Sequence, residues 1–512
     1  MLDYWKQHSQ EATVEEMMLD SCAKIIAREE RPEILSMLPD VDGRDVLELG
    51  AGIGRFTGQL SKIARHVTAV DFMEKFIQKN RESNGFRGNV TFLHADITAL
   101  ALPPHSFDLI FSNWLFMYLS DEELHGVTQK MVSWLRPGGY LFFRESCFHQ
   151  SGDAKRSFNP TKYRKPADYN HILTSVSQSP PEPQGTSCGL EIVMSKSVQA
   201  YIKLKRNQYQ VCWLLQKIQR NRSANLGFET FQKFLDNSQY SRVGILRYEK
   251  VFGRGFVSTG GLETTKEFVT MLKLEAGQQV LDVGCGIGGG DFYMAKTCGV
   301  EVLGMDLSSN MVEIAMERAL EEDTKLVQFE IADATKRNFP EHSFDVVYSR
   351  DTILHIADKP ALFRKFYEWL KPGGKLLVTD YCCGERPWTE IFEAYVKQRN
   401  YNLQTVRVYA QVLEGSGFVR VQALDRTDQF VGILNRELER IRGIQSEFVQ
   451  EFSEQDYDCI VSGWRQKLHR CALGEQRWGV FYAEKPETDG AARGGEVGVT
   501  PIPPVTLTPT PQ

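Results

Sequence analysis

Two segments of the chain share one pattern, Val280-Leu-Asp-Val-Gly-Cys-Gly-Ile-Gly-Gly-Gly290 and Val46-Leu-Glu-Leu-Gly-Ala-Gly-Ile-Gly54. Each predicts a short buried strand that ends in a glycine-rich loop and opens a helix. Glycine has no Cβ, so the backbone of such a loop can approach a ligand closely. The following helix would present free N–H groups at its N-terminus. Many strand–helix turns carry glycines for packing alone, so a single loop of this kind is weak evidence for a ligand.

The glycine spacing separates two nucleotide-binding chemistries. Dinucleotide-binding folds use G-x-G-x-x-G, whereas both loops here have G-x-G-x-G with an acid two residues before the first glycine. This variant resembles motif I of class I S-adenosylmethionine (AdoMet) methyltransferases, where the acid and the loop hold the amino acid end of AdoMet. The resemblance implies cofactor contacts by Glu48, Gly50 and Gly52 in one copy, and by Asp282, Gly284 and Gly286 in the other.

Further landmarks follow each loop in the same order. An apolar strand ends at Asp71 in one copy and at Asp306 in the other, where an acid can accept both ribose hydroxyls. The next strand leads to Asp96 or Asp333, and in methyltransferases that acid accepts from the adenine amino group. A Ser-Phe-Asp strand start and a Pro-Gly-Gly turn complete both copies. Matching landmarks lie 234 to 237 residues apart, which indicates tandem homologous domains.

The repeat predicts an α/β fold with two tandem Rossmann-like class I AdoMet methyltransferase domains. Each domain would have a mainly parallel seven-stranded sheet, with strand seven antiparallel and helices on both faces. The tail is rich in Gly, Pro and Thr and has few apolar anchors, so we expect it to be disordered. The expected boundaries are 1–222 and 239–487 for the domains, 223–238 for the connector and 488–512 for the tail.

Three segments outside the repeated cores have their own patterns. Residues 11–38 are rich in Glu, Met and Leu and predict a helix before the first strand. Residues 159–185 are polar and contain prolines, which cannot join a central strand or helix, so they predict a surface insertion. Residues 430–468 predict a helical lid over the second site. Tyr4 and Trp5 fit either a frayed terminus or a lid over the first site.

The composition is that of a soluble globular protein, with 42% hydrophobic and 25% charged residues. A net charge of −6 gives no electrostatic case for binding nucleic acid or anionic membranes. No apolar run is long enough to span a bilayer, and the first residues lack the apolar core of a signal peptide. The ten cysteines contain no C-x-x-C pair, which favours reduced thiols over a zinc site. We therefore expect a cytoplasmic monomer without metal, nucleic acid or membrane partners.

Longer strings resemble one family, the phosphoethanolamine N-methyltransferases. In the C-terminal half they are Gln239-Tyr-Ser-Arg-Val-Gly-Ile-Leu-Arg-Tyr248, Ser349-Arg-Asp-Thr-Ile-Leu-His355 and Tyr395-Val-Lys-Gln-Arg-Asn-Tyr401. The N-terminal half, with Phe143-Arg-Glu-Ser-Cys-Phe-His-Gln-Ser-Gly152, is similar to the first domain of two-domain, plant-type members. The resemblance covers nearly the whole chain apart from the tail. It implies one AdoMet per domain and a small phosphobase substrate. Phosphoethanolamine would become phosphocholine in three methylations, the first in domain one and the next two in domain two.

The resemblance also implies roles for individual residues. Tyr240 and His355 match the family's catalytic Tyr–His pair, which would handle the proton that an amine of pKa about 10 carries at neutral pH. Asp351, one turn before His355 if that segment is helical, would hold the cationic amine. The implied phosphate-binding residues are Tyr248, Tyr381, Tyr395, Arg399, Tyr401 and Lys467. Further implied cofactor contacts are Ile97, Asn113, Gln239, Ser258, Leu307, Ala334 and Arg350.

Domain one departs from the catalytic pattern. Aligning the two Ser-Phe-Asp motifs places Trp114 opposite Asp351 and Tyr118 opposite His355, so the Tyr–His pair is not reproduced. The candidate bases in domain one are Tyr4, His8 and Tyr118. Three alternatives stay open: a methyltransferase for another small amine or a lipid, such as a glycine or sterol acceptor; a regulatory, non-catalytic domain one; and an NAD-type oxidoreductase, which the glycine spacing disfavours.

Overall fold

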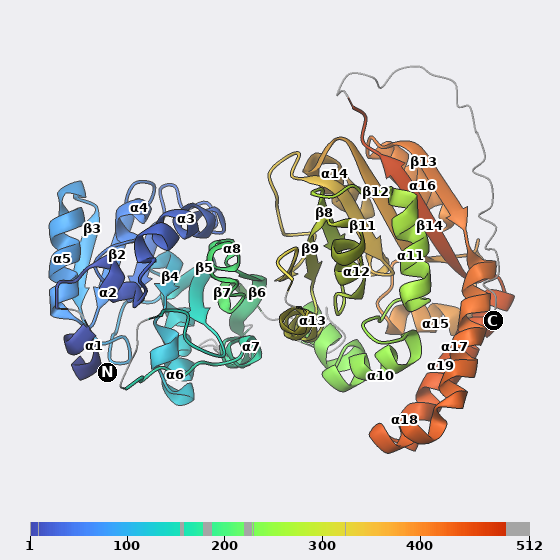
Figure 1. The fold of residues 1–512 in the computed structure, drawn as a ribbon, viewed down its shortest axis with the longest axis horizontal. Helices are drawn as coiled ribbons and strands as arrows, with labels where there is room; N and C mark the ends of the chain where they lie inside the picture. Colours follow the sequence, from blue (N-terminus) through green and yellow to red (C-terminus); the bar gives the residue numbers. More distant parts are fainter. Residues whose placement is uncertain are drawn as a thin grey trace.

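The computed structural model describes residues 2–8, 10–153, 158–177, 187–219, 228, 230–322 and 324–487. Its strands form one 14-stranded sheet in the order β13-β14-β12-β11-β8-β9-β10-β6-β7-β5-β4-β1-β2-β3. The sheet consists of two halves with the same arrangement, and helices cover both faces of each half (Figure 1). The predicted fold class is therefore confirmed. The predicted tail at 488–512 and residues 223–227 and 229 of the predicted connector lie outside the described residues.

Domain one, as the structure shows it, contains the strands β1 to β7. Neighbours among β1 to β5 run parallel, and β7 runs antiparallel between β5 and β6. The strands are β1 Asp45–Leu49, β2 His66–Asp71, β3 Val90–His94, β4 Phe107–Asn113, β5 Leu135–Ser146, β6 Cys188–Ser197 and β7 Gln210–Gln219. The helices are α1 Leu2–His8, α2 Val14–Met18, α3 Ala23–Ser36, α4 Thr57–Leu60, α5 Glu74–Asn84, η1 Gly85–Arg87, η2 Phe116–Tyr118, α6 Asp121–Trp134, α7 Pro166–Ser175 and α8 Gln199–Lys205.

Domain two repeats this arrangement with β8 to β14, and β14 is its antiparallel seventh strand. The strands are β8 Gln279–Val283, β9 Glu301–Asp306, β10 Val327–Ala332, β11 Phe344–Arg350, β12 Leu370–Cys383, β13 Val419–Asp425 and β14 Gln476–Glu484. The helices are α9 Phe231–Phe234, η4 Leu235–Gln239, α10 Arg242–Phe252, α11 Gly261–Leu272, α12 Gly289–Cys298, α13 Ser309–Glu321, η5 Ile353–His355, α14 Lys359–Trp369, α15 Glu390–Gln398, α16 Val406–Gly415, α17 Thr427–Gly443, α18 Gln445–Glu451 and α19 Glu454–Ala472.

Three predicted segments differ in detail from the structure. The helix expected over 11–38 is two helices, because Leu19 adopts a left-handed conformation with φ 52° and ends α2. The helical stretch expected over 430–468 is divided among α17, α18 and α19. The surface insertion expected over 159–185 is wrong for α7, whose Tyr169 and Leu173 are fully buried. Pro166 opens that helix at its first turn, where a missing N–H costs nothing.

The two halves of the sheet join edge to edge. β6 of domain one pairs antiparallel with β10 of domain two, and Met194 lies opposite Ala332. An ion pair between Lys336 and Glu191, at 3.0 Å, crosses the same boundary. The pairing covers a strand edge that would otherwise present unpaired N–H and C=O groups. Because Asp333 follows Ala332 directly, domain one meets domain two beside a predicted cofactor residue.

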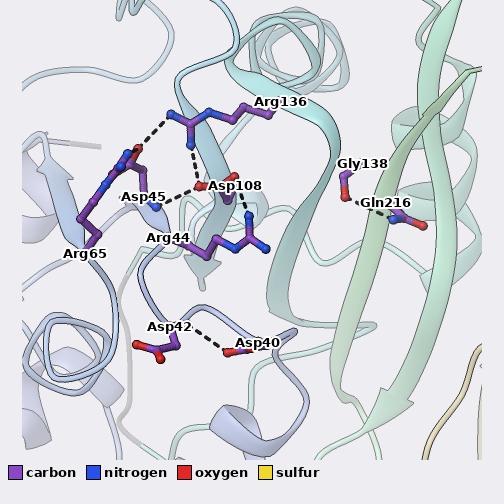
Figure 2. Close-up of polar contacts among 9 residues, drawn as sticks. All are labelled: Asp40, Asp42, Arg44, Asp45, Arg65, Asp108, Arg136, Gly138 and Gln216. Atoms are coloured by element: carbon purple, nitrogen blue, oxygen red, sulfur yellow. Dashed lines mark hydrogen bonds and ion pairs between the residues drawn. The ribbon is translucent and has the colours of Figure 1, made fainter.

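Two of the repeated motifs serve the sheet itself. Asp108 of the first Ser-Phe-Asp motif accepts hydrogen bonds from the backbone N–H of Asp45 at 3.0 Å and from Arg136 at 2.5 Å (Figure 2). In domain two, Lys371 donates to the equivalent Asp345 at 2.7 Å. These contacts tie the starts of the first and fourth strands to the start of the fifth. The glycine loops follow the opposite, carboxyl ends of the strands, so these motifs repeat for structural reasons.

Within the described part of the chain, no helix is long and apolar enough to cross a membrane. The ten cysteines are free. Among the same described residues, no group of three or more His, Cys, Asp or Glu side chains could hold a metal ion.

Candidate active sites

The loop of domain two requires glycine at two positions, because their backbones are left-handed and a Cβ would collide with neighbouring side chains. Gly284 has φ +84°, and a Cβ there would collide with Thr352. Gly286 has φ +55°, and a Cβ there would lie 2.8 Å from Val257. Asp306, at the end of β9, accepts the N–H of Gly286 at 3.0 Å. Burial raises the pKa of Asp306 to about 6, so the side chain is an anionic acceptor at neutral pH.

The acid before each loop is buried and paired. Asp282 shares a hydrogen bond with Asp291, and burial raises the pKa of both carboxyls, so the pair holds a proton. In domain one, Glu48 occupies the equivalent place and accepts a hydrogen bond from Thr57. Burial also raises the pKa of Glu48, to about 8. In both domains the acid before the glycine loop is therefore buried, hydrogen-bonded and raised in pKa.

A cavity of about 570 Å³ opens above the loop of domain two. That volume lies in the range of small-molecule sites, about 300 to 1,000 Å³. Twelve residues predicted to bind cofactor or substrate line it: Tyr240, Ser258, Asp282, Gly284, Gly286, Asp306, Leu307, Asp333, Ala334, Arg350, Asp351 and His355. The glycine cradle, the ribose-type acid and the cavity size together fit AdoMet.

Two of the predicted cofactor residues of domain two have other partners. The guanidinium of Arg350 donates to the hydroxyls of Thr264 and Thr265, each at 2.9 Å, and so fixes the start of α11. The side-chain amide of Gln239 donates to the backbone carbonyl of Arg399 at 3.0 Å. Gln239 is buried and does not line the cavity. Their cofactor roles remain predictions.

Tyr240 and His355 meet in this cavity. The Tyr240 hydroxyl lies 3.3 Å from Nε2 of His355. Burial lowers the pKa of His355 to about 3, with smaller effects from Lys359 and Arg399, so the imidazole is neutral and can accept. Burial raises the pKa of Tyr240, so its hydroxyl keeps its proton and can donate to Nε2 in the tautomer whose imidazole proton is on Nδ1. The lone pairs of the phenol oxygen then remain free for a substrate N–H.

Asp351 lines the same cavity, but not on a helix. The segment from Asp351 to His355 is not an α-helix, because Asp351 has φ 50° and precedes the 3-10 turn η5, so the two residues are not one helical turn apart. Its carboxylate accepts from Trp478 at 2.9 Å and from Thr379 at 3.1 Å. It also accepts from the N–H of Thr259 at 3.3 Å. The carboxylate is therefore fixed at the cavity wall, where it can face a cationic amine.

The predicted phosphate-binding residues gather beside the Tyr–His pair. Tyr248, Tyr395, Arg399 and Lys467 line a second cavity of about 170 Å³. The ring of Tyr401 lies 5.1 Å from that of His355 and 5.8 Å from that of Tyr395. The Tyr381 ring lies 5.7 Å from Lys467 Nζ. The two predicted basic residues, with Arg247 and Arg470 and several tyrosine hydroxyls, thus surround a space that could hold a phosphate.

Three residues at this site were not predicted from the sequence. Trp478 donates to Asp351, Arg470 stacks on the ring of Tyr395 at 3.8 Å, and Trp464 lies 4.1 Å from Lys467 Nζ. For Trp464 and Arg470 a signal existed, because they lie three residues either side of Lys467 on α19. Such spacing places side chains on one helix face.

The charge of Lys467 is expected to make catalysis pH-dependent. Burial lowers the pKa of Lys467 to about 8, so its ammonium loses its proton where ordinary lysines stay charged. The value of kcat/KM for the phosphobase should therefore fall as the pH rises through about 8. In Lys467→Arg the guanidinium stays charged, and this fall should be absent. Equal falls in both proteins, measured from pH 7 to 9, would contradict the assignment.

Domain one holds its predicted cofactor acid in the same geometry. Asp71 accepts the N–H of Gly52 at 2.8 Å, as Asp306 accepts that of Gly286. The cavity above this loop has a volume of only about 90 Å³. The Met17 methyl group lies 2.5 Å from where a Cβ on Gly52 would be. Domain one is therefore closed by its own α2.

The other predicted residues of domain one occupy places equivalent to those in domain two. Glu48, Gly50, Asp71 and Asn113 line the small cavity. Asp96 follows β3 and accepts from the N–H of Thr98 at 2.8 Å, as Asp333 accepts from that of Thr335 at 2.9 Å. Ile97 is buried beside it. Asp96 and Ile97 do not line the cavity, so their cofactor roles remain predictions.

The acceptor end of domain one differs from that of domain two. Trp114 has φ 57°, close to the 50° of Asp351, as the alignment of the two domains predicts. Its indole N–H donates to Gln210 on β7 at 2.8 Å. In domain two the indole is instead on the seventh strand, as Trp478 of β14, and its acceptor is Asp351 after the fourth strand. The Tyr118 ring lies 5.8 Å from that of Trp5. The side chain of His8 lies outside the described residues.

The fold and the paired loops define a tandem class I AdoMet methyltransferase. Residues 46–139 and 281–378 each match a family described as a methyltransferase domain. A phosphoethanolamine N-methyltransferase of Triticum aestivum is 55% identical over 487 residues, which are 94% of this chain and 94% of that protein. The chain belongs to the phosphoethanolamine N-methyltransferase family, and it is an AdoMet-dependent enzyme that methylates the nitrogen of phosphobases.

Two further relatives describe the range of this family. A phosphoethanolamine N-methyltransferase of Plasmodium falciparum (isolate 3D7) is 41% identical over 255 residues, which are 49% of this chain and 95% of that protein. The solved structure of Haemonchus contortus phosphoethanolamine N-methyltransferase 2, in complex with phosphomonomethylethanolamine and S-adenosylhomocysteine, has a TM-score of 0.74 and 28% identity. It covers 90% of this chain and 99% of that one.

Proposed function

We propose that this enzyme converts phosphoethanolamine to phosphocholine in three methyl transfers, which supplies phosphatidylcholine synthesis. Domain one, at residues 1–222, performs the first transfer, and domain two, at 239–487, performs the next two. Residues 223–238 connect them. One observation carries the substrate assignment: the Tyr240–His355 pair lies beside a cluster of cationic and tyrosine side chains that suits a phosphate.

In domain two, the residues of the chain position the amine and manage its proton. AdoMet supplies the methyl group on a sulfonium sulfur, which is a good leaving site. Asp351 attracts the cationic amine, and the Tyr240 oxygen accepts one of its N–H groups. As the amine gives its proton to the phenol oxygen, the phenol gives its own proton to Nε2 of His355, which leaves the nitrogen lone pair free to attack the methyl carbon. Holding nucleophile and methyl carbon in line can account for much of the rate.

Phosphate binding also makes His355 a better acceptor. The positive charge of Arg399 is one of the groups that lower the pKa of His355. A phosphate dianion bound to Arg399 offsets that charge, so the pKa of the histidine rises when substrate binds. Burial remains the largest cause of the low pKa of His355, and the bound phosphate removes the smaller effect of Arg399, so the Tyr–His pair gains basicity when a phosphobase binds.

Domain one would use a different acceptor arrangement. An indole replaces the carboxylate of Asp351, and Tyr118 replaces His355. Tyr4 is buried next to Trp5, which packs on Tyr118. These aromatic side chains could hold the amine and exclude water while it loses its proton. Entry of AdoMet requires α1 and α2 to move, because the cavity is below the size of ordinary ligand pockets.

We further propose that the enzyme acts as a cytoplasmic monomer without nucleic acid or membrane partners. Its phosphobase substrates are water-soluble, and its cysteines are unpaired. A regulatory, non-catalytic domain one remains the second candidate, favoured by its closed cavity and missing Tyr–His pair. The cofactor-acid variants described in the Discussion distinguish these two roles.

A comparison of acceptors tests the substrate. With AdoMet, phosphoethanolamine is expected to give mono-, di- and trimethyl products in a mass-spectrometric assay, whereas free ethanolamine and glycine are expected to give none. The reason is that ethanolamine has no anion for Arg399 and Lys467 to bind, and glycine carries a carboxylate instead of a phosphate. Turnover of ethanolamine within threefold of phosphoethanolamine would contradict the proposal and favour another small-amine substrate.

A further inference from the structure

A short turn after the fourth strand carries the acceptor-side residue in each domain. In domain two this turn is η5, which ends at His355, and in domain one it is η2, which ends at Tyr118. Both turns pack on the cofactor loop. Leu115 lies 3.3 Å from where a Cβ on Gly50 would be, and Thr352 fills the corresponding place at Gly284. The position of the turn therefore affects both ligands.

In domain two, a buried lysine fixes the turn. Lys359 is the first residue of α14 and is 1% exposed. Its ammonium donates to the carbonyls of Ile353 and Ile356 at 2.7 and 2.9 Å. On the other side lies the buried carboxyl of Asp380, which accepts from the Tyr409 hydroxyl at 3.3 Å and is close enough to the backbone N–H of Leu354 for that group to lower its pKa. Lys359 thus holds the carbonyl side of the turn, and a buried acid lies at its N–H side.

Domain one has no lysine at this position, but another residue donates to the equivalent carbonyls. The residue aligned with Lys359 is Glu122, which is exposed and cannot donate to a carbonyl. Arg164 instead donates to the carbonyl of Phe116 at 3.0 Å and to that of Leu119 at 2.5 Å. These are the carbonyls equivalent to those that Lys359 binds. Arg164 is 2% exposed, and it lies between β5 and α7, whereas Lys359 begins the helix between the fourth and fifth strands of domain two.

The backbone N–H groups of the domain-one turn make more hydrogen bonds to a buried acid than those of the domain-two turn. The carboxyl of Glu145 accepts from the N–H groups of Leu115, Phe116 and Met117 at 3.0, 2.7 and 3.2 Å. Glu145 is fully buried on β5, as Asp380 is on β12. In both domains a buried basic side chain and a buried acid therefore lie on opposite sides of the turn, but the residues differ.

We propose that Arg164 is a positioning residue for methyl transfer in domain one, where it replaces Lys359 and holds the turn that carries Tyr118. Arg164 does not line the domain-one cavity. It acts through the carbonyls of Phe116 and Leu119, which set where Tyr118 and Leu115 lie. This inference rests on the proposed role of domain one in the first transfer.

Matched substitutions test the inference in the full-length enzyme. Arg164→Met keeps most of the side-chain volume but removes the donors, and Lys359→Met does the same in domain two. We expect Arg164→Met to lower kcat for the first methylation of phosphoethanolamine at least tenfold, with the KM for phosphoethanolamine changed less than threefold. Methylation of phosphomonomethylethanolamine should stay within twofold of wild type. Lys359→Met should show the reverse pattern.

Rescue separates positioning from general stability. Arg164→Lys can still donate to both carbonyls, so it should recover kcat to within threefold of wild type. A first-step kcat for Arg164→Met within twofold of wild type would overturn the proposal. So would a loss of all three steps, because Arg164 would then serve the fold. If Asp71→Ala leaves the first step intact, domain one lacks its proposed role, and that failure is visible without any Arg164 variant.

Discussion

The Tyr240→Phe enzyme is expected to convert phosphoethanolamine to phosphomonomethylethanolamine and to stop there. The substitution removes only the hydroxyl that lies 3.3 Å from His355 and leaves the ring in place. A positioned group of this kind contributes roughly 10²- to 10⁴-fold to a proton-dependent step. We therefore expect kcat for phosphomonomethylethanolamine to fall at least 100-fold, while the first transfer, which uses domain one, keeps its rate.

A matched control distinguishes this effect from a general loss of a hydroxyl. Tyr293 lies on α12 of the same domain and lines neither cavity of domain two. Tyr293→Phe should leave all three transfers within twofold of wild type. His355→Asn should resemble Tyr240→Phe, because either change removes the hydrogen bond. A Tyr240→Phe enzyme that retains more than a third of wild-type kcat for the monomethyl substrate would contradict the Tyr–His assignment.

Asp71→Ala and Asp306→Ala are expected to block different methyl transfers, because each removes a predicted cofactor-binding acid from one domain. Asp71→Ala removes the acceptor of the Gly52 N–H and the predicted acceptor of the ribose hydroxyls, and Asp306→Ala does the same beside Gly286. Each buried donor left without a partner costs about 1 to 3 kcal/mol, besides the lost cofactor contacts. AdoMet affinity at the altered domain should fall on the order of 100-fold or more, since about 1.4 kcal/mol corresponds to a factor of ten.

The two variants should therefore fail at different substrates. Asp71→Ala should not methylate phosphoethanolamine but should carry phosphomonomethylethanolamine to phosphocholine. Asp306→Ala should accumulate phosphomonomethylethanolamine. Titration calorimetry with AdoMet should show one intact site in each protein. If Asp71→Ala methylates phosphoethanolamine at the wild-type rate, domain one is regulatory rather than catalytic.

Local patterns in the sequence predict the loops and the acids beside them. The strand before Gly284, the strand that ends at Asp306, and their repetition in domain one each depend on residues close together in the chain. The alignment of the domains also predicts that Trp114 replaces Asp351, and both residues have left-handed backbones at that point. Such features follow from chain order alone, because parallel strands of one sheet bring their carboxyl ends together.

Other features depend on contacts between distant residues and leave no local pattern. Trp478 holds Asp351 from 127 positions away, and Arg164 holds the carbonyl of Phe116 from 48 positions away. Likewise, no pattern in β6 indicates that it pairs with β10 of the other domain. The sequence leaves open whether the segment from Asp351 to His355 is helical, because a left-handed residue and a 3-10 turn have no strong composition of their own.

Complementation between two inactive enzymes tests the central claim, that two separate sites divide the three transfers, most directly. Neither Asp71→Ala nor Asp306→Ala should make phosphocholine from phosphoethanolamine and AdoMet. An equimolar mixture should make it, because phosphomonomethylethanolamine released by intact domain one of Asp306→Ala can diffuse to intact domain two of Asp71→Ala. Mass spectrometry of the mixture would follow the three products over time. Phosphocholine from Asp71→Ala alone, or none from the mixture, would contradict the division of the pathway between the domains.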